Sequence, residues 1–204
     1  MPEKTALVAL VLLVACGPSQ QGLVPAELPQ ASPAYDKAIL RWTRHASHSR
    51  NFETVIDAHA TLMSADWRAA YVTERVRRAR LGPDDAAELA GKEQARAEEV
   101  WEIELVTATH DFAANDFARG ERSMWIVRLV GDEGRAVAPI EIREDHRPKS
   151  EIGSWFPGFG PFHRAHVLTF PKNAADGRPL AAGGALRLKL GSALGAVELG
   201  WAAR

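Results

Sequence analysis

Histidine and aspartate side chains at two-residue spacing are the first candidates for chemistry. Asp57 and His59 alternate with apolar residues over residues 52–62, which places both on the polar face of a predicted strand. A second polar set follows the end of another predicted strand: His110, Asp111 and Asp116. If the two strands pair, these groups could form a cluster for a metal ion or for acid–base catalysis. The favoured alternative is an exposed polar face beside a turn rich in Asn and Asp.

Two further histidine pairs have a spacing of three residues, His45 with His48 and His163 with His166. A metal site needs at least two imidazoles that converge, usually with a carboxylate. His45 and His48 could share one face of a helix. Positions i and i+3 of a strand face opposite ways, so His163 and His166 cannot bind the same ion. Solvated side chains are the favoured interpretation of both pairs.

Four aromatic side chains lie in a short segment rich in Pro and Gly: Trp155, Phe156, Phe159 and Phe162. We expect Pro and Gly to keep this segment from forming a helix or a strand. Aromatic side chains on a rigid loop can make a binding surface, because they bury a large area at little entropic cost. They can also plug the end of a β-sandwich, and by a narrow margin the plug is favoured.

Residues 64–81 are predicted to form a helix, which carries five arginines: Arg68, Arg75, Arg77, Arg78 and Arg80. Beside a membrane these side chains could contact anionic lipid headgroups. The favoured interpretation is a solvated helix face, balanced by Glu74 and by the acidic helix that follows.

Charge and motifs exclude several classes of protein. The 25 basic and 26 acidic residues give a net charge of −1, which argues against a nucleic-acid partner. The chain contains no phosphate-binding loop, zinc-protease motif, serine-hydrolase motif or dinucleotide fingerprint, and we expect no bound cofactor. Cys16 is the one cysteine, so the folded part can contain neither a disulfide nor a cysteine-based zinc site.

Cys16 directly follows ten apolar residues, 6–15. As a helix this run would reach about 15 Å, half the hydrocarbon thickness of a bilayer, which suits the hydrophobic core of a signal peptide. The last four residues, Leu13-Val14-Ala15-Cys16, resemble the lipobox of bacterial lipoproteins. The resemblance covers only the start of the chain.

The lipobox resemblance implies a signal peptide over residues 1–15, lipid on Cys16 and attachment to a membrane of the cell envelope. Aspartate after the cysteine is the inner-membrane retention signal of that family, and residue 17 is Gly. The resemblance therefore implies the outer membrane where the cell has one. Residues 16–33 contain four prolines and are predicted to be a disordered tether, and residues 34–204 a single domain.

Within that domain, helices are predicted over residues 35–47, 64–81 and 85–99. From residue 101 onward, apolar residues mostly recur with a period of two. With residues 52–62, this pattern predicts about seven strands: 52–62, 101–105, 125–129, 140–142, 164–170, 186–190 and 197–201. The fold class is therefore α+β, mainly an antiparallel, Ig-like β-sandwich with two helices inserted after the first strand.

These features favour a lipid-anchored envelope protein with a non-catalytic binding domain, whose partner is another envelope protein or a cell-wall polymer. The alternative is a metal-dependent hydrolase or a metal-binding protein that uses the cluster of Asp57, His59, His110 and Asp111. A third possibility is a passive structural lipoprotein.

Overall fold

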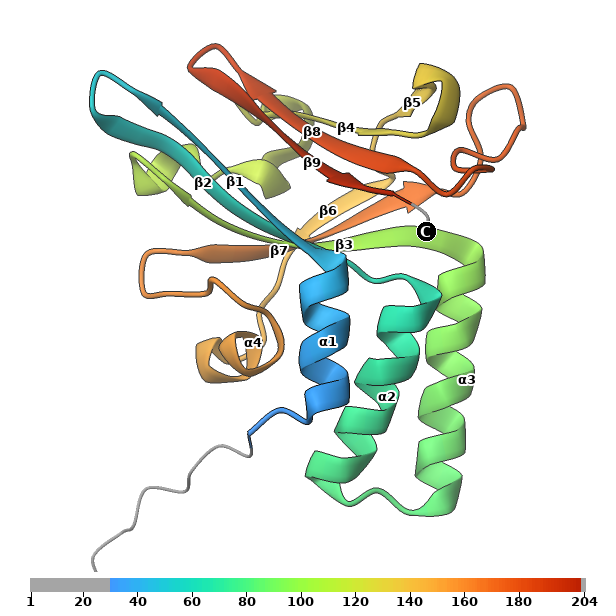
Figure 1. The fold of residues 1–204 in the computed structure, drawn as a ribbon. Helices are drawn as coiled ribbons and strands as arrows, with labels where there is room; N and C mark the ends of the chain where they lie inside the picture. Colours follow the sequence, from blue (N-terminus) through green and yellow to red (C-terminus); the bar gives the residue numbers. More distant parts are fainter. Residues whose placement is uncertain (1–29, 203–204) are drawn as a thin grey trace, which may run out of the picture.

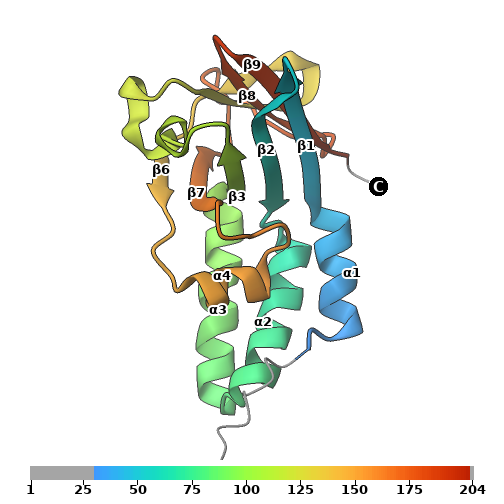
Figure 2. The same cartoon turned by 90° about the vertical axis from the view of Figure 1, so that its left-hand side faces the viewer.

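The computed structural model describes residues 30–202, arranged in three layers (Figures 1 and 2). A four-stranded sheet packs on a five-stranded sheet, and helices cover the other face of the five-stranded sheet. Cys16, the predicted signal peptide and most of the predicted tether lie outside the described residues.

The four α-helices within the described range are α1 (Pro33–Trp42), α2 (Ala65–Ala79), α3 (Pro83–Glu99) and α4 (Lys149–Trp155). The strands are β1 (Thr43–Arg50), β2 (Glu53–Leu62), β3 (Val100–Thr109), β4 (Ile126–Val130), β5 (Ala136–Val137), β6 (Glu141–Glu144), β7 (Arg164–Pro171), β8 (Leu186–Ser192) and β9 (Gly195–Trp201). Short 3-10 segments η1 (Phe112–Ala114), η2 (Phe117–Arg122) and η3 (Asp132–Gly134) connect the strands.

Both sheets are antiparallel throughout. The five-stranded sheet has the order β1-β2-β3-β7-β6, and the four-stranded sheet has the order β5-β4-β8-β9. The predicted α+β class with antiparallel sheets is confirmed, and each of the seven predicted strands corresponds to a strand of the structure. β5 has only two residues, too few for an alternating pattern to reveal it.

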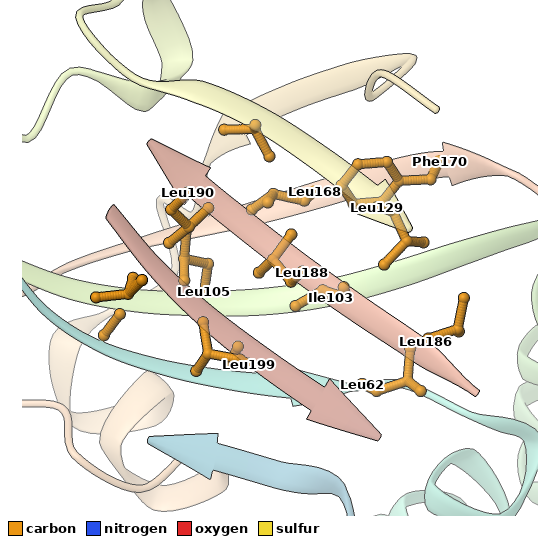
Figure 3. Packing of buried hydrophobic residues seen from close by; sticks show 14 of the residues in the cluster. Leu62, Ile103, Leu105, Leu129, Leu168, Phe170, Leu186, Leu188, Leu190 and Leu199 are labelled. Atoms are coloured by element: carbon orange, nitrogen blue, oxygen red, sulfur yellow. The ribbon is translucent and has the colours of Figure 1, made fainter. Parts of the chain in front are cut away.

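The core between the sheets is built from alternate residues of their facing strands (Figure 3). Ile56, Ala58, Ala60 and Leu62 of β2 all face it, as predicted for one side of this strand. Leucines of the four-stranded sheet meet them from the other side, among them Leu129 and Leu188, both completely buried. Burial of such a side chain stabilises the fold by roughly 1.5–3 kcal/mol.

A second cluster joins the five-stranded sheet to the helices: Tyr35, Trp67, Val106, Ile152, Trp155, Phe156 and Ala165. α2 begins as predicted, with the Ser64 hydroxyl accepting a hydrogen bond from the Trp67 N–H at 3.1 Å. The rings of Trp67 and Tyr71, one helical turn apart, stack with centroids 5.1 Å apart. The polar face predicted for β2 is therefore half covered rather than fully solvated.

The helix predicted over residues 35–47 is wrong in its second half. α1 ends at Trp42, and the next eight residues form β1, which pairs with β2 along its whole length. A full ladder of backbone hydrogen bonds outweighs the weak helical spacing that Ile39 and Trp42 set locally. The strand predicted to be first is thus the second, and α2 and α3 follow β2.

The boundary between α2 and α3 also differs from the prediction. Arg80, not Gly82, has the left-handed conformation that ends α2, with φ 51°. Gly82 instead caps the start of α3, and Pro83 takes the first helical position, two residues before the predicted start. As predicted for a surface helix, none of the residues of α3 is buried.

Candidate functional site

The β1–β2 hairpin brings two histidines together on the face of the sheet that points away from the core. In its register His45 lies directly opposite His59. Their rings stack with centroids 4.3 Å apart and planes 23° apart. Asp57 lies on the same face of β2, two residues before His59. Strand pairing thus fixes the backbone of all three residues.

Asp57 is the centre of this cluster. His45 Nε2 lies 2.9 Å from Asp57 Oδ2, and His59 Nε2 lies 3.4 Å from Asp57 Oδ1. The potential ligand atoms of the three residues lie within 4.8 Å of one another. A third imidazole approaches from the segment before β7, with His163 Nε2 3.9 Å from Asp57 Oδ1. We call His45, Asp57, His59 and His163 the histidine cluster.

The loop between α4 and β7 packs directly on the histidine cluster. Gly158 has φ +81°, and a Cβ atom there would lie 2.6 Å from His59 Nδ1, closer than real Cβ contacts. A Cβ atom on Gly160 would lie 3.1 Å from His163 Nδ1. The two glycines therefore allow the backbone to approach the rings.

The environment of the histidine cluster is partly desolvated. The side chains of His59 and His163 are 23% and 20% exposed, Asp57 is 30% exposed, and His45 is half-exposed. Desolvation and the neighbouring His45 lower the pKa of His59, although Asp57 opposes the shift. His163 Nδ1 is buried and has no hydrogen-bond partner among the described residues.

The structure separates the other predicted polar residues from this cluster. β2 and β3 do pair, but Ala108 lies opposite Asp57, and the His110 N–H donates to the Val55 carbonyl at 3.3 Å. Asp111 Oδ1 accepts a hydrogen bond from the Ala113 N–H at 2.9 Å and caps η1. Asp116 Oδ1 accepts one from the Ser123 hydroxyl at 2.8 Å. These acids therefore stabilise a turn.

The second histidine of each predicted pair points away from the cluster. His48 lies beside the backbone of Gly195 in β9. His166 is 1% exposed and packs on Phe117, with ring centroids 5.5 Å apart. Burial, together with nearby Arg164, lowers the pKa of His166 to about 4. The expectation that His163 and His166 diverge agrees with this arrangement.

The four loop aromatics do not form one surface. Trp155 and Phe156 are buried, at 6% and 2% exposed, and belong to the cluster beneath the helices. Phe159 packs partly against that cluster, and Phe162 is 77% exposed. The expectation that this segment contains no helix is wrong for its start, because Trp155 ends α4 before Pro157 can interrupt a helix.

All four arginines of α2 form ion pairs or hydrogen bonds with carboxylates, and the fifth arginine of the predicted helix, Arg80, is its C-cap. Arg77 and Arg78 both donate to Glu74, and these bonds, Arg77 first, lower the pKa of Glu74 to about 2. Arg75 lies 3.9 Å from Glu151. Arg68 is buried between Glu93 of α3 and Glu102 of β3. The predicted balance of charges therefore holds, but Arg68 is not solvated.

Comparison with protein-family models, curated proteins and solved structures found no match for the chain. Among residues 30–202, no helix combines the length and the apolar character needed to cross a bilayer.

Sequence reasoning named Asp57 and His59 as site residues but assigned them the wrong neighbours. His45 was expected on a helix, which gave no reason to place it opposite His59. His163 is far from Asp57 in the sequence and reaches it only because β7 pairs with β3. The available signal was only a histidine on each of three segments, His45, His59 and His163.

Proposed function

We propose that this protein binds a divalent transition-metal ion at the histidine cluster. His45, Asp57 and His59 supply the first three ligands, and His163 is placed to supply the fourth. The observation that carries the proposal is the convergence of three imidazoles on one carboxylate: two from the paired strands β1 and β2, and His163 from the segment just before β7. A purely structural pair would need only one histidine for Asp57.

The donor set favours zinc and similar ions. Imidazole nitrogen with one carboxylate oxygen suits Zn²⁺, Ni²⁺ and Cu²⁺, whereas Ca²⁺ and Mg²⁺ require mostly oxygen ligands. Within the described residues, Asp57 is the one carboxylate in contact with these histidines. If Asp57 is a ligand, no second carboxylate is at hand as a general base, which favours binding over hydrolysis.

We further propose that this metal-binding domain is held at the cell envelope by lipid on Cys16, facing the periplasm or the cell surface. The support is the lipobox-like end of the apolar run, since Cys16 lies outside the described residues. A Cys16→Ser variant expressed in the source cell should leave the membrane fraction and become soluble, while the unchanged chain stays bound. Equal membrane association of both would contradict lipid anchoring.

The fold itself is best described as a two-layer β-sandwich with a helical layer added. The shared core of both sheets supports the sandwich. We do not propose an Ig-like strand order for this sandwich. β1, β2 and β3 are consecutive neighbours in one sheet here, whereas the immunoglobulin order interrupts such a run.

Zinc titration of the mature chain by calorimetry, after removal of metal with a chelator, tests the proposed function. We expect one Zn²⁺ per chain, at least tenfold weaker binding in His59→Ala and Asp57→Asn, and no response to Ca²⁺. His110→Ala is the matched control and should bind zinc like the unchanged chain. Absence of stoichiometric binding, or an equal loss in His110→Ala, would contradict the proposal.

A further inference from the structure

The segment between α4 and β7, residues 157–163, is attached firmly only at its two ends. Before it, Phe156 is 2% exposed, and its N–H donates to the Ile152 carbonyl at 2.9 Å. After it, β7 pairs with β3 along its whole length. The one hydrogen bond that the segment makes among the described residues is internal, from the His163 N–H to the Gly160 carbonyl at 3.0 Å. We call residues 157–163 the histidine loop.

Apolar and backbone contacts hold the middle of the histidine loop. The backbone of Gly158 lies against the His59 ring, and Phe159 packs partly against the cluster beneath the helices. Segments with few buried contacts and few hydrogen bonds open locally at a low free-energy cost. The one polar side chain of the loop is that of His163, which faces Asp57. Four of the seven residues are exposed: Pro157, Gly158, Pro161 and Phe162.

His163 differs from the other two histidines of the cluster in its distance from Asp57. With bonds of about 2.0–2.2 Å, the donor atoms of a tetrahedral zinc site lie about 3.3–3.6 Å apart. The nitrogens of His45 and His59 lie 2.9 and 3.4 Å from the Asp57 oxygens. The nitrogen of His163 lies 3.9 Å away and is outside the group of mutually close ligand atoms. The paired strands thus hold three ligands ready, and the fourth has to come closer with the histidine loop.

We propose that a bound metal ion fastens the histidine loop to the β1–β2 hairpin, so that metal occupancy controls how readily the loop opens. The inference rests on the proposed function, because His163 ties the loop down only as the fourth ligand. Opening of the loop breaks the bond between His163 and the ion and leaves three ligands. Metal binding and loop closure therefore favour each other, and by linkage each strengthens the other by the same factor.

Limited proteolysis of the mature chain with chymotrypsin, with and without zinc, tests this inference. Chymotrypsin cleaves after aromatic residues, and Phe162 is 77% exposed within the histidine loop. Cleavage requires the loop to open, and at low protease concentration its rate follows the population of the open form. We expect saturating zinc to slow cleavage after Phe162 at least about fivefold, the lower limit of typical coupling between two sites. Phe112, 53% exposed in η1, provides a reference rate that zinc should leave unchanged.

His163→Ala is the decisive variant. It keeps His45, Asp57 and His59, so it should still bind zinc, but more weakly than the unchanged chain. Zinc should no longer slow cleavage after Phe162 in this variant. Because the coupling is reciprocal, the fold loss of zinc affinity, measured by calorimetry, should match the fold protection that proteolysis loses. Thermal unfolding of the metal-free variant shows whether its fold is intact.

Two results with a chain that binds zinc would overturn the inference: equal cleavage after Phe162 with and without zinc, or zinc protection that persists in His163→Ala. Resistance of the metal-free chain at Phe162 would overturn it too, since the histidine loop would then stay closed without an ion. In each of these cases the metal site itself stands. A chain that binds no zinc would contradict the proposed function, and calorimetry on the same sample distinguishes that failure.

Discussion

At the scale of single residues, the histidine cluster can form because several residues around it are small. The loop that covers His59 and His163 approaches them through Gly158 and Gly160, and Ala108, opposite Asp57, is small. His163 can reach Asp57 because no large side chain lies between them. Small residues around the histidine cluster are therefore part of what allows its side chains to meet.

Gly158→Ala should destabilise the protein and weaken zinc binding. The new Cβ atom would overlap the His59 ring, and the residue would have to keep a positive φ. Gly177→Ala is the matched control, since its φ is +79° but no atom lies within 4 Å of the added Cβ. We expect a loss of about 1 kcal/mol for the control and a larger loss for Gly158→Ala, measured by urea unfolding. Equal losses would show that the loop does not press on His59.

Glu104→Gln should remove a pH dependence of stability. Because burial raises the folded-state pKa of Glu104, its contribution is complete below about pH 4.5, the value in the unfolded chain, and is lost as the pH rises through the folded-state pKa. The stability of the unchanged chain relative to Glu104→Gln should therefore fall as the pH rises above 4.5. Denaturant unfolding over a series of pH values measures it, and parallel curves for the two chains would contradict the raised pKa.

Residue types alone predicted part of the histidine cluster. Alternation with apolar neighbours put Asp57 and His59 on one face, because a strand has a period of two. The same rule excluded a joint role for His163 and His166. No local rule could connect Asp57 with His163, since that contact exists only after β3 and β7 pair.

At the scale of elements, α3 differs from the other helices, because hydrogen bonds and ion pairs rather than buried side chains hold it in place. α3 has no buried residue, and Arg68 and Arg96 link it to the rest of the protein. The sequence of α3 predicts its exposure, because it is rich in Ala, Glu, Lys and Arg and has little apolar face. The exact helix ends were harder to predict, because a glycine such as Gly82 can cap either the end of α2 or the start of α3.

Arg80→Gly should stabilise the end of α2. Arg80 has the left-handed conformation that glycine adopts without strain, so the substitution should raise the free energy of unfolding by roughly 0.5–1 kcal/mol. Arg80→Ala removes the same charge without relieving the backbone and should give no gain. A gain in both variants would attribute the effect to charge instead.

At the scale of the whole molecule, the two sheets share one core and should unfold as a unit. Leu188→Ala creates a cavity in the centre of that core and should cost roughly 2–5 kcal/mol. Ile126→Ala, on a side chain that is 64% exposed, is the control and should change little. Denaturation followed by tryptophan fluorescence and by far-UV circular dichroism should give coincident transitions. Separate transitions would mean that the sheets unfold independently.

The sequence predicted the strands of this molecule better than their arrangement. Local alternation reveals a strand, and a short turn reveals a hairpin such as β8–β9. The neighbours β3 with β7 and β4 with β8 come from segments far apart in the chain, so only their packing together decides the order. The Ig-like expectation came from the number of strands, which does not determine their order.

The α2–α3 hairpin leaves and rejoins the sheet at adjacent points, with Leu62 paired to Ile103 and the Met63 N–H bonded to the Glu102 carbonyl. In topological terms it is an insertion in a β-hairpin that a short turn could close. Loop-closure entropy grows slowly, by about 0.6 kcal/mol for each doubling of length, so such an insertion delays strand pairing only modestly. The insertion supplies Trp67 and Arg68 to the cavity between α2 and the five-stranded sheet but no residue of the histidine cluster. In evolution, therefore, the cavity could be gained or lost with this one segment while the histidine cluster remained.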